Sequence, residues 1–160
     1  MWGYISIDLS PDPSFLPQFS AGGGLFRTLK GFEIGTSVRY MSFRRSEVIL
    51  LIPSFILYLP RGFFYTASLY LNVDGGTYTL ANRLSYKRDR WYAFLYVSAG
   101  TSSERLEATE DVLKYRTSSF GFGAEYRINK KFSFGTSFIK EYRAGLYTRR
   151  GFDIYGRYWW

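Results

Sequence analysis

Acid–base chemistry needs paired ionisable side chains, and one such pair stands in the segment 102–116, where Glu107 and Asp111 lie four positions apart. Two neighbouring carboxylates, or a Ser–Lys pair in the same segment, could transfer protons or attack a substrate. The chain has no histidine and no cysteine, so it lacks the commonest general base, the commonest zinc ligand and any thiolate. Solvated loop charge explains the segment more simply. The sequence therefore predicts no catalytic residue, no cofactor and no metal site.

Charged residues also recur at alternate positions of extended segments. Because successive side chains of a β-strand point to opposite faces, every second residue shares a face. The charges that fall on the more polar face, our candidate lumen-lining residues, are Glu33, Arg39, Asp74, Arg83, Lys87, Glu125, Arg127, Glu141, Asp153 and Arg157. With Asp8 they make five positive and six negative charges, whereas an anion-selective pore would carry a ring of one sign.

These charges have two interpretations. We expect an ion-pair and hydrogen-bond network that fills a narrow lumen, because buried charges are normally paired. The alternative is a polar conduit for a neutral sugar chain, to which four tyrosines of the same face would contribute. They are Tyr70, Tyr92, Tyr96 and Tyr155.

The elements that would hold these side chains are ten β-strands. At the end of the chain, Phe152, Ile154, Tyr158 and Trp160 alternate with polar residues, which is typical of a strand with one apolar face. The predicted strands are roughly Trp2–Ser10, Gln18–Thr28, Phe32–Phe43, Val48–Leu59, Phe63–Asp74, Thr77–Lys87, Trp91–Thr101, Thr117–Arg127, Phe132–Glu141 and Gly151–Trp160. A helical turn or two is conceivable only in Glu104–Lys114.

The connections between these segments alternate between short turns and mostly longer loops. Short turns and longer loops at opposite ends are typical of an up-and-down barrel in the outer membrane, with the turns in the periplasm. Aromatic residues flank the short turns on the apolar face and predict an interfacial girdle. The candidate membrane-interface aromatics are Phe32, Tyr58, Phe63, Tyr86, Trp91, Tyr126, Phe132, Tyr158 and Trp160.

The polar face is rich in glycine and serine, which suits the concave side of a tightly curved sheet, so we expect it to point inward and the apolar face to meet lipid. Two residues fit this assignment less well. Pro53 cannot donate to a ladder and predicts a bulge, and Arg27 falls on the apolar face, from which it would have to reach the interface.

The formal net charge of +8 comes mostly from turns and loops. The rim arginines Arg44, Arg45, Arg143, Arg149 and Arg150 are either solvated or paired with lipid phosphates, such as those of lipopolysaccharide. Binding of nucleic acid would need aromatic and basic residues on one face. Here the largest aromatics share a face with Leu and Val, so we expect no nucleic-acid partner.

Several short pieces of the chain, in this order and spacing, resemble the YaiO-type outer-membrane β-barrel proteins. They are Ser10-Pro11 with Phe15-Leu16-Pro17, Gly22–Leu29 with Gly31-Phe32-Glu33, Gly75-Gly76, Arg83-Leu84-Ser85, Tyr147–Gly151 and Tyr158-Trp159-Trp160. Most members of the family end on Phe where this chain has Trp160, and they carry further strands before the region that matches Trp2. The resemblance implies an outer-membrane location and a role in surface polysaccharide export, and it brings no catalytic residues.

We therefore expect one all-β domain over residues 1–160, an antiparallel up-and-down transmembrane barrel of about ten strands in the outer membrane of a Gram-negative bacterium. Because no secretory signal follows Met1, we expect that a leader was removed or that strands upstream of Trp2 complete a larger barrel. The leading function is a non-enzymatic membrane component that contacts lipid and a glycan. A rim-site enzyme and a soluble ligand-binding barrel are the alternatives, and behaviour without detergent separates the last from the others.

Overall fold

The computed structural model describes residues 1–10, 17–44, 46–105 and 112–158 of the chain. Ten strands run through them: β1 (Trp2–Leu9), β2 (Phe19–Leu29), β3 (Phe32–Ser42), β4 (Glu47–Tyr58), β5 (Phe63–Asn72), β6 (Thr77–Arg88), β7 (Trp91–Arg105), β8 (Val112–Arg127), β9 (Phe132–Arg143) and β10 (Tyr147–Tyr158). One 3-10 turn, η1 (Pro60–Gly62), joins β4 to β5. The predicted all-β class of about ten strands is confirmed. Among the described residues, no helix is long and apolar enough to cross a membrane.

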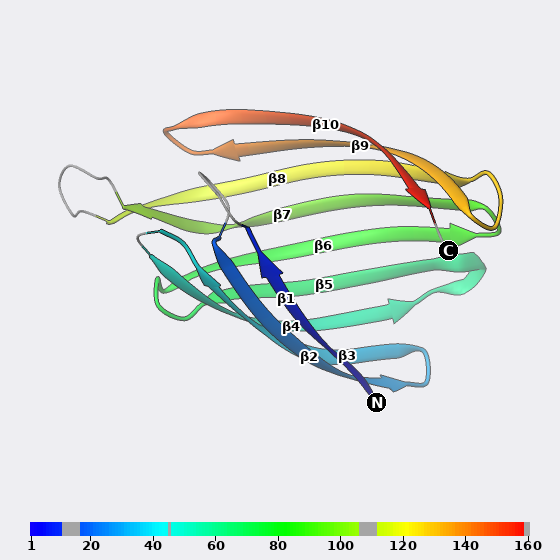
Figure 1. Ribbon diagram of the computed structural model, residues 1–160, viewed down its shortest axis with the longest axis horizontal. Coiled ribbons are helices and arrows are strands. Elements are labelled where there is room, and N and C mark those ends of the chain that lie inside the picture. Colours follow the sequence, from blue (N-terminus) through cyan, green and yellow to red (C-terminus); the bar gives the residue numbers. More distant parts are fainter. Residues whose placement is uncertain (11–16, 45, 106–111, 159–160) are drawn as a thin grey trace.

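Each strand pairs in antiparallel fashion with the next one along the chain, so the strand order in the sheet is the sequence order, and the sheet curls on itself (Figure 1). The connections 30–31, 59–62, 89–90 and 128–131 lie at one end, which we call the turn end. The other connections lie at the opposite end, the loop end. This up-and-down arrangement is the predicted one.

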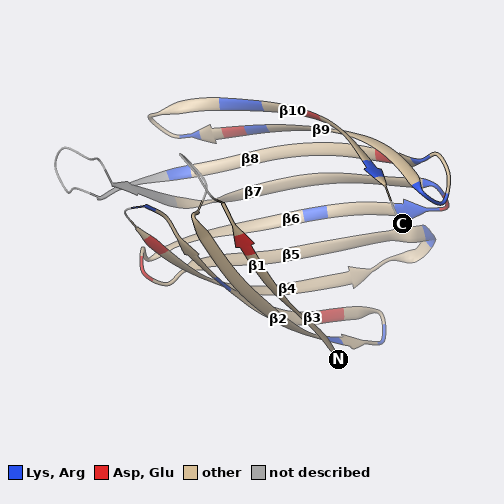
Figure 2. Ribbon diagram, in the orientation of Figure 1, with Lys and Arg blue, Asp and Glu red and all other residues tan. Residues whose placement is uncertain are grey.

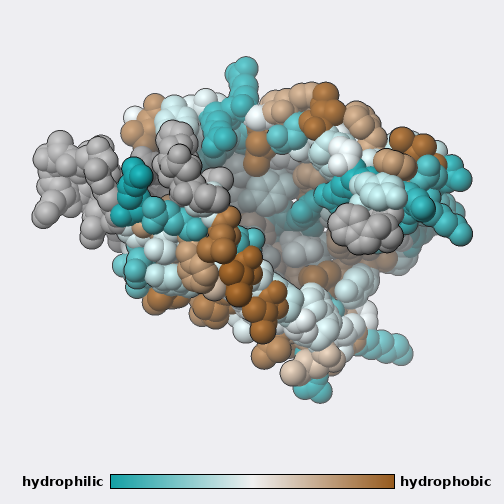
Figure 3. All heavy atoms as spheres, in the orientation of Figure 1, coloured by the Kyte–Doolittle hydropathy of each residue, from teal (hydrophilic) through white to brown (hydrophobic). Residues whose placement is uncertain are grey.

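The burial pattern is the reverse of that in a water-soluble barrel. Large apolar side chains are exposed on the outer face, for example Ile5 at 87% and Leu9 at 76%. The space-filling view shows such hydrophobic side chains along β1, in front of a hollow (Figure 3). The buried residues among those described are small or polar, and Ala81 is the one buried hydrophobic residue. Because exposed apolar surface is unfavourable in water, this outer face fits a lipid surrounding.

Glycines of the inward face make room for aromatic rings from the neighbouring strand. A Cβ at Gly123 would lie 2.6 Å from the ring of Phe94, and one at Gly135 would lie 2.5 Å from the ring of Tyr155. Each glycine is the direct ladder partner of the aromatic residue that covers it. The sheet therefore uses glycine at these positions so that rings can lie flat against the wall, which narrows the hollow.

Two sequence predictions about the strands are wrong. The segment 102–116 was expected to be a loop or a short helix, but Ser102–Arg105 and Val112–Arg116 continue β7 and β8 as a paired extension. Polar residues can continue a pair of strands beyond the apolar band. Without alternating apolar residues, the sequence does not show where such strands end. Pro53 does not make a bulge, because the β4–β5 register is the same on both sides of it. Leu51 pairs with Leu71 and Ser54 with Ser68, and the ladder skips only the two positions between them.

The sheet is open along one seam. Between the described residues no ladder joins β1 to β10, and both are edge strands. Edge N–H and C=O groups need partners in hydrocarbon, where each unsatisfied group costs several kcal/mol. In a membrane, the backbone groups of these two edges would need pairing partners.

Candidate functional site

The inward face carries five charged side chains around a cavity of about 590 Å³ at the turn end. Four are cations, Arg83 and Lys87 on β6, Arg127 on β8 and Arg157 on β10, and the fifth is Glu125. Figure 2 shows how basic residues gather around this end of β6, β8 and β10. We call these five residues the turn-end cluster. Its formal charge is +3, from four cations and one carboxylate.

The ladder register explains why residues distant in sequence meet here. Lys87, Tyr92, Glu125, Gly135 and Tyr155 are successive direct partners across β6 to β10. Because strand residues in direct register lie about 5 Å apart and share a face, the five positions form one row across the wall. Arg127 and Arg157 flank Ser133 one step nearer the turns.

Arg83 is held in place by two aromatic residues. Its Nη2 donates a hydrogen bond of 2.7 Å to the Tyr92 hydroxyl, and its guanidinium carbon lies 4.0 Å above the centre of the Phe94 ring. Stacking over a ring face stabilises a cation. Phe94 in turn lies over Gly123. The Arg83 Nε is buried and has no hydrogen-bond partner.

Among the described residues, Glu125 forms an ion pair with one cation, Arg157. Its Oε2 lies 3.3 Å from Nη1 of Arg157 and accepts a hydrogen bond of 3.4 Å from the Tyr155 hydroxyl. The Arg157 side chain is 55% exposed, so this ion pair contributes little to stability. The ion pair matters more for the charge of the cavity, because it neutralises the one carboxylate of the cluster.

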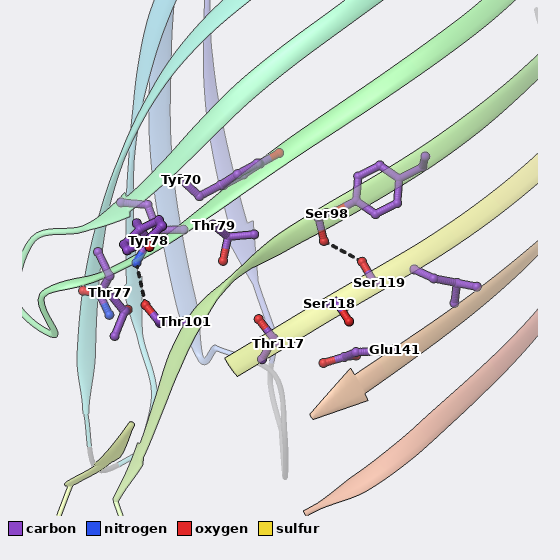
Figure 4. Close-up of a pocket in the computed structure, with 14 residues that line it drawn as sticks. Tyr70, Thr77, Tyr78, Thr79, Ser98, Thr101, Thr117, Ser118, Ser119 and Glu141 are labelled. Atoms are coloured by element: carbon purple, nitrogen blue, oxygen red, sulfur yellow. Dashed lines mark hydrogen bonds between the residues drawn. The ribbon is translucent and has the colours of Figure 1, made fainter. Parts of the chain in front are cut away.

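A second cavity of about 440 Å³ lies on the inward face at the loop end (Figure 4). Its lining is mostly neutral: three tyrosines, Tyr70, Tyr78 and Tyr96, and several serine and threonine hydroxyls, with Glu141 as the one carboxylate. Ser98 and Ser119 share a hydrogen bond of 2.6 Å across β7 and β8. Glu141 accepts a 2.6 Å hydrogen bond from the Arg143 Nε on the same strand. The linings of the two cavities therefore differ in charge.

Most inward carboxylates accept hydrogen bonds from neutral groups rather than from the predicted cations. Glu33, which is 3% exposed, accepts from the Trp2 indole at 3.0 Å and from the Thr28 hydroxyl at 2.7 Å. Asp153 accepts from Ser137 at 3.2 Å. The ion-pair network expected from the sequence is thus confined, among the described residues of the predicted set, to Arg157 with Glu125. Neutral donors can also satisfy a carboxylate, and the alternation of the sequence does not show which kind of donor lies beside it.

The register places the predicted lumen-lining charges on the inward face with one exception. Glu33, Arg39, Arg83, Lys87, Glu125, Arg127, Glu141, Asp153 and Arg157 share it. Asp74 does not, because β5 ends at Asn72 and Asp74 lies exposed in the β5–β6 turn. The Asn72 side chain accepts a hydrogen bond from the Gly75 N–H, which closes the turn there. Alternation alone does not show where a strand stops.

The predicted interface aromatics mostly form cross-strand ring pairs on the outer face at the turn end. Phe63 with Tyr86, Trp91 with Tyr126, and Phe132 with Tyr158 have ring centres 4.8, 4.8 and 4.9 Å apart. Phe32 packs against Phe55 with ring centres 5.8 Å apart. Their position at a lipid interface stays a prediction, and Trp160 lies outside the described residues.

For Tyr58 the predicted position on the outer face is wrong. It pairs with Phe64, so it faces inward with Ile56 and Ser54, while Leu57 takes the outer position beside Phe32. The segment Val48–Leu59 is apolar on both faces, so its pattern carries no information about which residues point outward.

Some inward and outward residues were not foreseen. Arg143 and Arg149 lie on the inward face near Glu141, whereas the cations Lys140 and Arg150 are direct partners on the outer face. Of the other rim arginines, Arg44 is exposed between β3 and β4, and Arg45 lies outside the described residues. Glu107 and Asp111, the carboxylate pair considered for catalysis, also lie outside them.

Known proteins support the fold and the location. No curated protein matches this chain. A solved structure of the NanC porin is similar to it, with a TM-score of 0.56 and 10% sequence identity over 95% of this chain and 76% of that one. At this identity the likeness shows the fold alone, a porin-like β-barrel. The family described as the YaiO membrane β-barrel domain matches residues 1–105. This match covers more than half of the 160 residues, so the chain belongs to the YaiO membrane β-barrel family and is an outer-membrane β-barrel protein.

Proposed function

We propose that this outer-membrane barrel of a Gram-negative bacterium is not an enzyme and that its inward face contacts a polar saccharide chain as a component of surface polysaccharide export. The observation that carries the proposal is the loop-end cavity, where Tyr70 and Tyr96 stand among serine and threonine hydroxyls. Sugars present hydroxyl groups and apolar C–H faces, which match hydroxyl partners and aromatic rings. Export as the direction of transport comes from the family resemblance.

The hydroxyl pairs of the inward face support a binding role rather than a chemical one. Ser98 pairs with Ser119 at 2.6 Å, and Ser54 pairs with Ser68 at 2.9 Å. A serine becomes a nucleophile when a neighbouring base takes its proton. In these pairs the hydrogen-bond partner is a second serine, and the nearby carboxylate Glu141 accepts from the Arg143 Nε instead. In each pair one hydroxyl hydrogen and several lone pairs are left over, and these can form hydrogen bonds with a ligand.

The test is a complementation experiment in the native host. Deleting the gene should reduce the polysaccharide at the cell surface, and the wild-type gene should restore it. Tyr70→Ala and Tyr96→Ala should restore it only in part, because they remove inward rings. Tyr142→Ala is the matched control, since Tyr142 points to the outer face at the same end and is 52% exposed. Full restoration by both inward variants, at equal protein levels, would refute the proposal.

The outer face suggests a lipid partner as well. Lys140 and Arg150 are direct neighbours across β9 and β10, both exposed and close to the loop end. Below them on the same face lie Phe138 and Phe152, which are also partners. Cations at the edge of an apolar band are placed to reach lipid headgroups. We propose that they contact lipid phosphates, such as those of lipopolysaccharide, on the loop side.

A further inference from the structure

The turn-end cluster has three cations without a matching carboxylate. Within the described part of the chain, no acidic side chain lies within ion-pair distance of Arg83, Lys87 or Arg127. The carboxylate of the cavity, Glu125, is already engaged by Arg157 at 3.3 Å. Like charges confined to one hollow repel each other unless an anion or water lies between them. The arrangement therefore has a capacity for negative charge that the protein itself does not fill.

The geometry of Arg83 points to a ligand. Its guanidinium is fixed by the Phe94 ring at 4.0 Å and by the Tyr92 hydroxyl at 2.7 Å, while its buried Nε has no partner. A buried donor without a protein partner is costly unless water or a ligand accepts its hydrogen bond. A planar guanidinium held in one orientation suits a bidentate oxyanion.

The cavity is lined by aromatic rings and phenol hydroxyls as well as by charged groups. Tyr92 and Tyr155 line it in the same row as Lys87, and its volume of about 590 Å³ exceeds what a single small ion requires. Phe94 and Phe64 also line it. Rings and phenol hydroxyls beside fixed cations suit an anionic group that is attached to a polar ring.

We propose that the turn-end cavity binds the acidic unit of a saccharide, a sugar that carries a carboxylate or a phosphate. Arg83 and Lys87 receive the oxyanion, Arg127 adds to the positive potential, and Tyr92 and Tyr155 contact the sugar ring. Glu125 limits the attraction by neutralising Arg157. The proposal names the substrate class of the proposed function and rests on it, and it assigns the acidic part of the chain to the turn end.

Calorimetric titration of the folded full-length protein in detergent at low salt tests the site. The probes are glucuronate and glucose 6-phosphate, with glucose as the neutral ring and inorganic phosphate as the free anion. We expect both acidic sugars to bind at least tenfold more tightly than glucose and than inorganic phosphate. Binding should weaken as salt is added, because salt screens exposed charges.

Three variants locate the site. Arg83→Gln and Lys87→Gln should each weaken glucuronate binding about tenfold or more. Lys87 is exposed, so its variant keeps the test informative if Arg83→Gln does not fold. Glu125→Gln should strengthen binding several-fold, because it frees Arg157. The control Lys130→Gln removes the same charge at the same end but in the exposed β8–β9 turn, and it should change nothing.

The outcomes separate this inference from the proposed function. Glucose binding as tightly as glucuronate, or unchanged affinity in Lys87→Gln and Glu125→Gln, would overturn the acidic site and leave glycan contact standing. Inorganic phosphate matching glucose 6-phosphate would show a site for free anions and would overturn the saccharide assignment. Failure of the proposed function would instead appear in the host, as normal surface polysaccharide in the deletion strain.

Discussion

The two cavities of the inward face lie at opposite ends of the same sheet, and their linings differ in charge. At the turn end, four cations and one carboxylate surround a cavity whose rings lie on glycines. At the loop end, the cavity is lined by hydroxyls and tyrosines with one carboxylate, Glu141. The near-neutral total charge expected from the sequence hides this separation. A lumen can be balanced overall and still attract an anion at one end and hold a neutral ring at the other.

The comparison presupposes that both cavities lie on the inward face. The test with the largest expected effect places a charge on each face in the middle of a strand. Leu69→Arg places a charge on the outer face and should cost about 2–4 kcal/mol in bilayers, because lipid does not solvate it. Ser68→Arg, one residue away, points inward and should cost less. Folding free energies in lipid vesicles are the measurement. Equal costs would undo the face assignment and with it the contrast between the ends.

The next test concerns the glycines that seat the rings of the turn end. Gly135→Val should cost about 1–3 kcal/mol, because any Cβ there would overlap the Tyr155 ring and overpacking forces side chains off their rotamers. It should also weaken the acidic-sugar binding that depends on this wall. Gly156→Ala is the control, since the nearest atom to its Cβ would be 3.9 Å away. Equal denaturation midpoints for both variants would show that the position of the ring does not depend on glycine beneath it.

The smallest effect is expected on the outer face at the loop end. Replacing Lys140 or Arg150 by Gln should weaken interaction with anionic lipid by about 1 kcal/mol each, since a basic residue near a charged membrane surface contributes roughly that much. The comparison is unfolding stability in vesicles with and without anionic lipid. Arg149→Gln, on the inward face of the same strand, should show no such lipid dependence. A loss independent of lipid charge would assign Lys140 and Arg150 to solvation alone.

Most of the fold could be predicted from the sequence, because two simple rules determine it. Alternation placed Arg83, Lys87, Glu125, Arg127 and Arg157 on one face, and the order of short turns and longer loops predicted an up-and-down sheet. These rules failed where polar and apolar residues do not alternate or where a strand ends. Tyr58 follows a run that is apolar on both faces, Asp74 lies just past the end of a strand, and the β7–β8 hairpin extends into polar sequence.

The sequence by itself determined the strand number, the sequential pairing and the reversal of polar and apolar faces, because these depend on the period-two pattern and on local turn chemistry. Only the tertiary structure decided which charges meet. Register across five strands brings Lys87, Glu125 and Tyr155 into one row, and rings lying on glycines fix Arg83 beside Tyr92. Parity assigns a residue to a face but not to a height on it, so the cationic end of the lumen appears only when the strands are aligned.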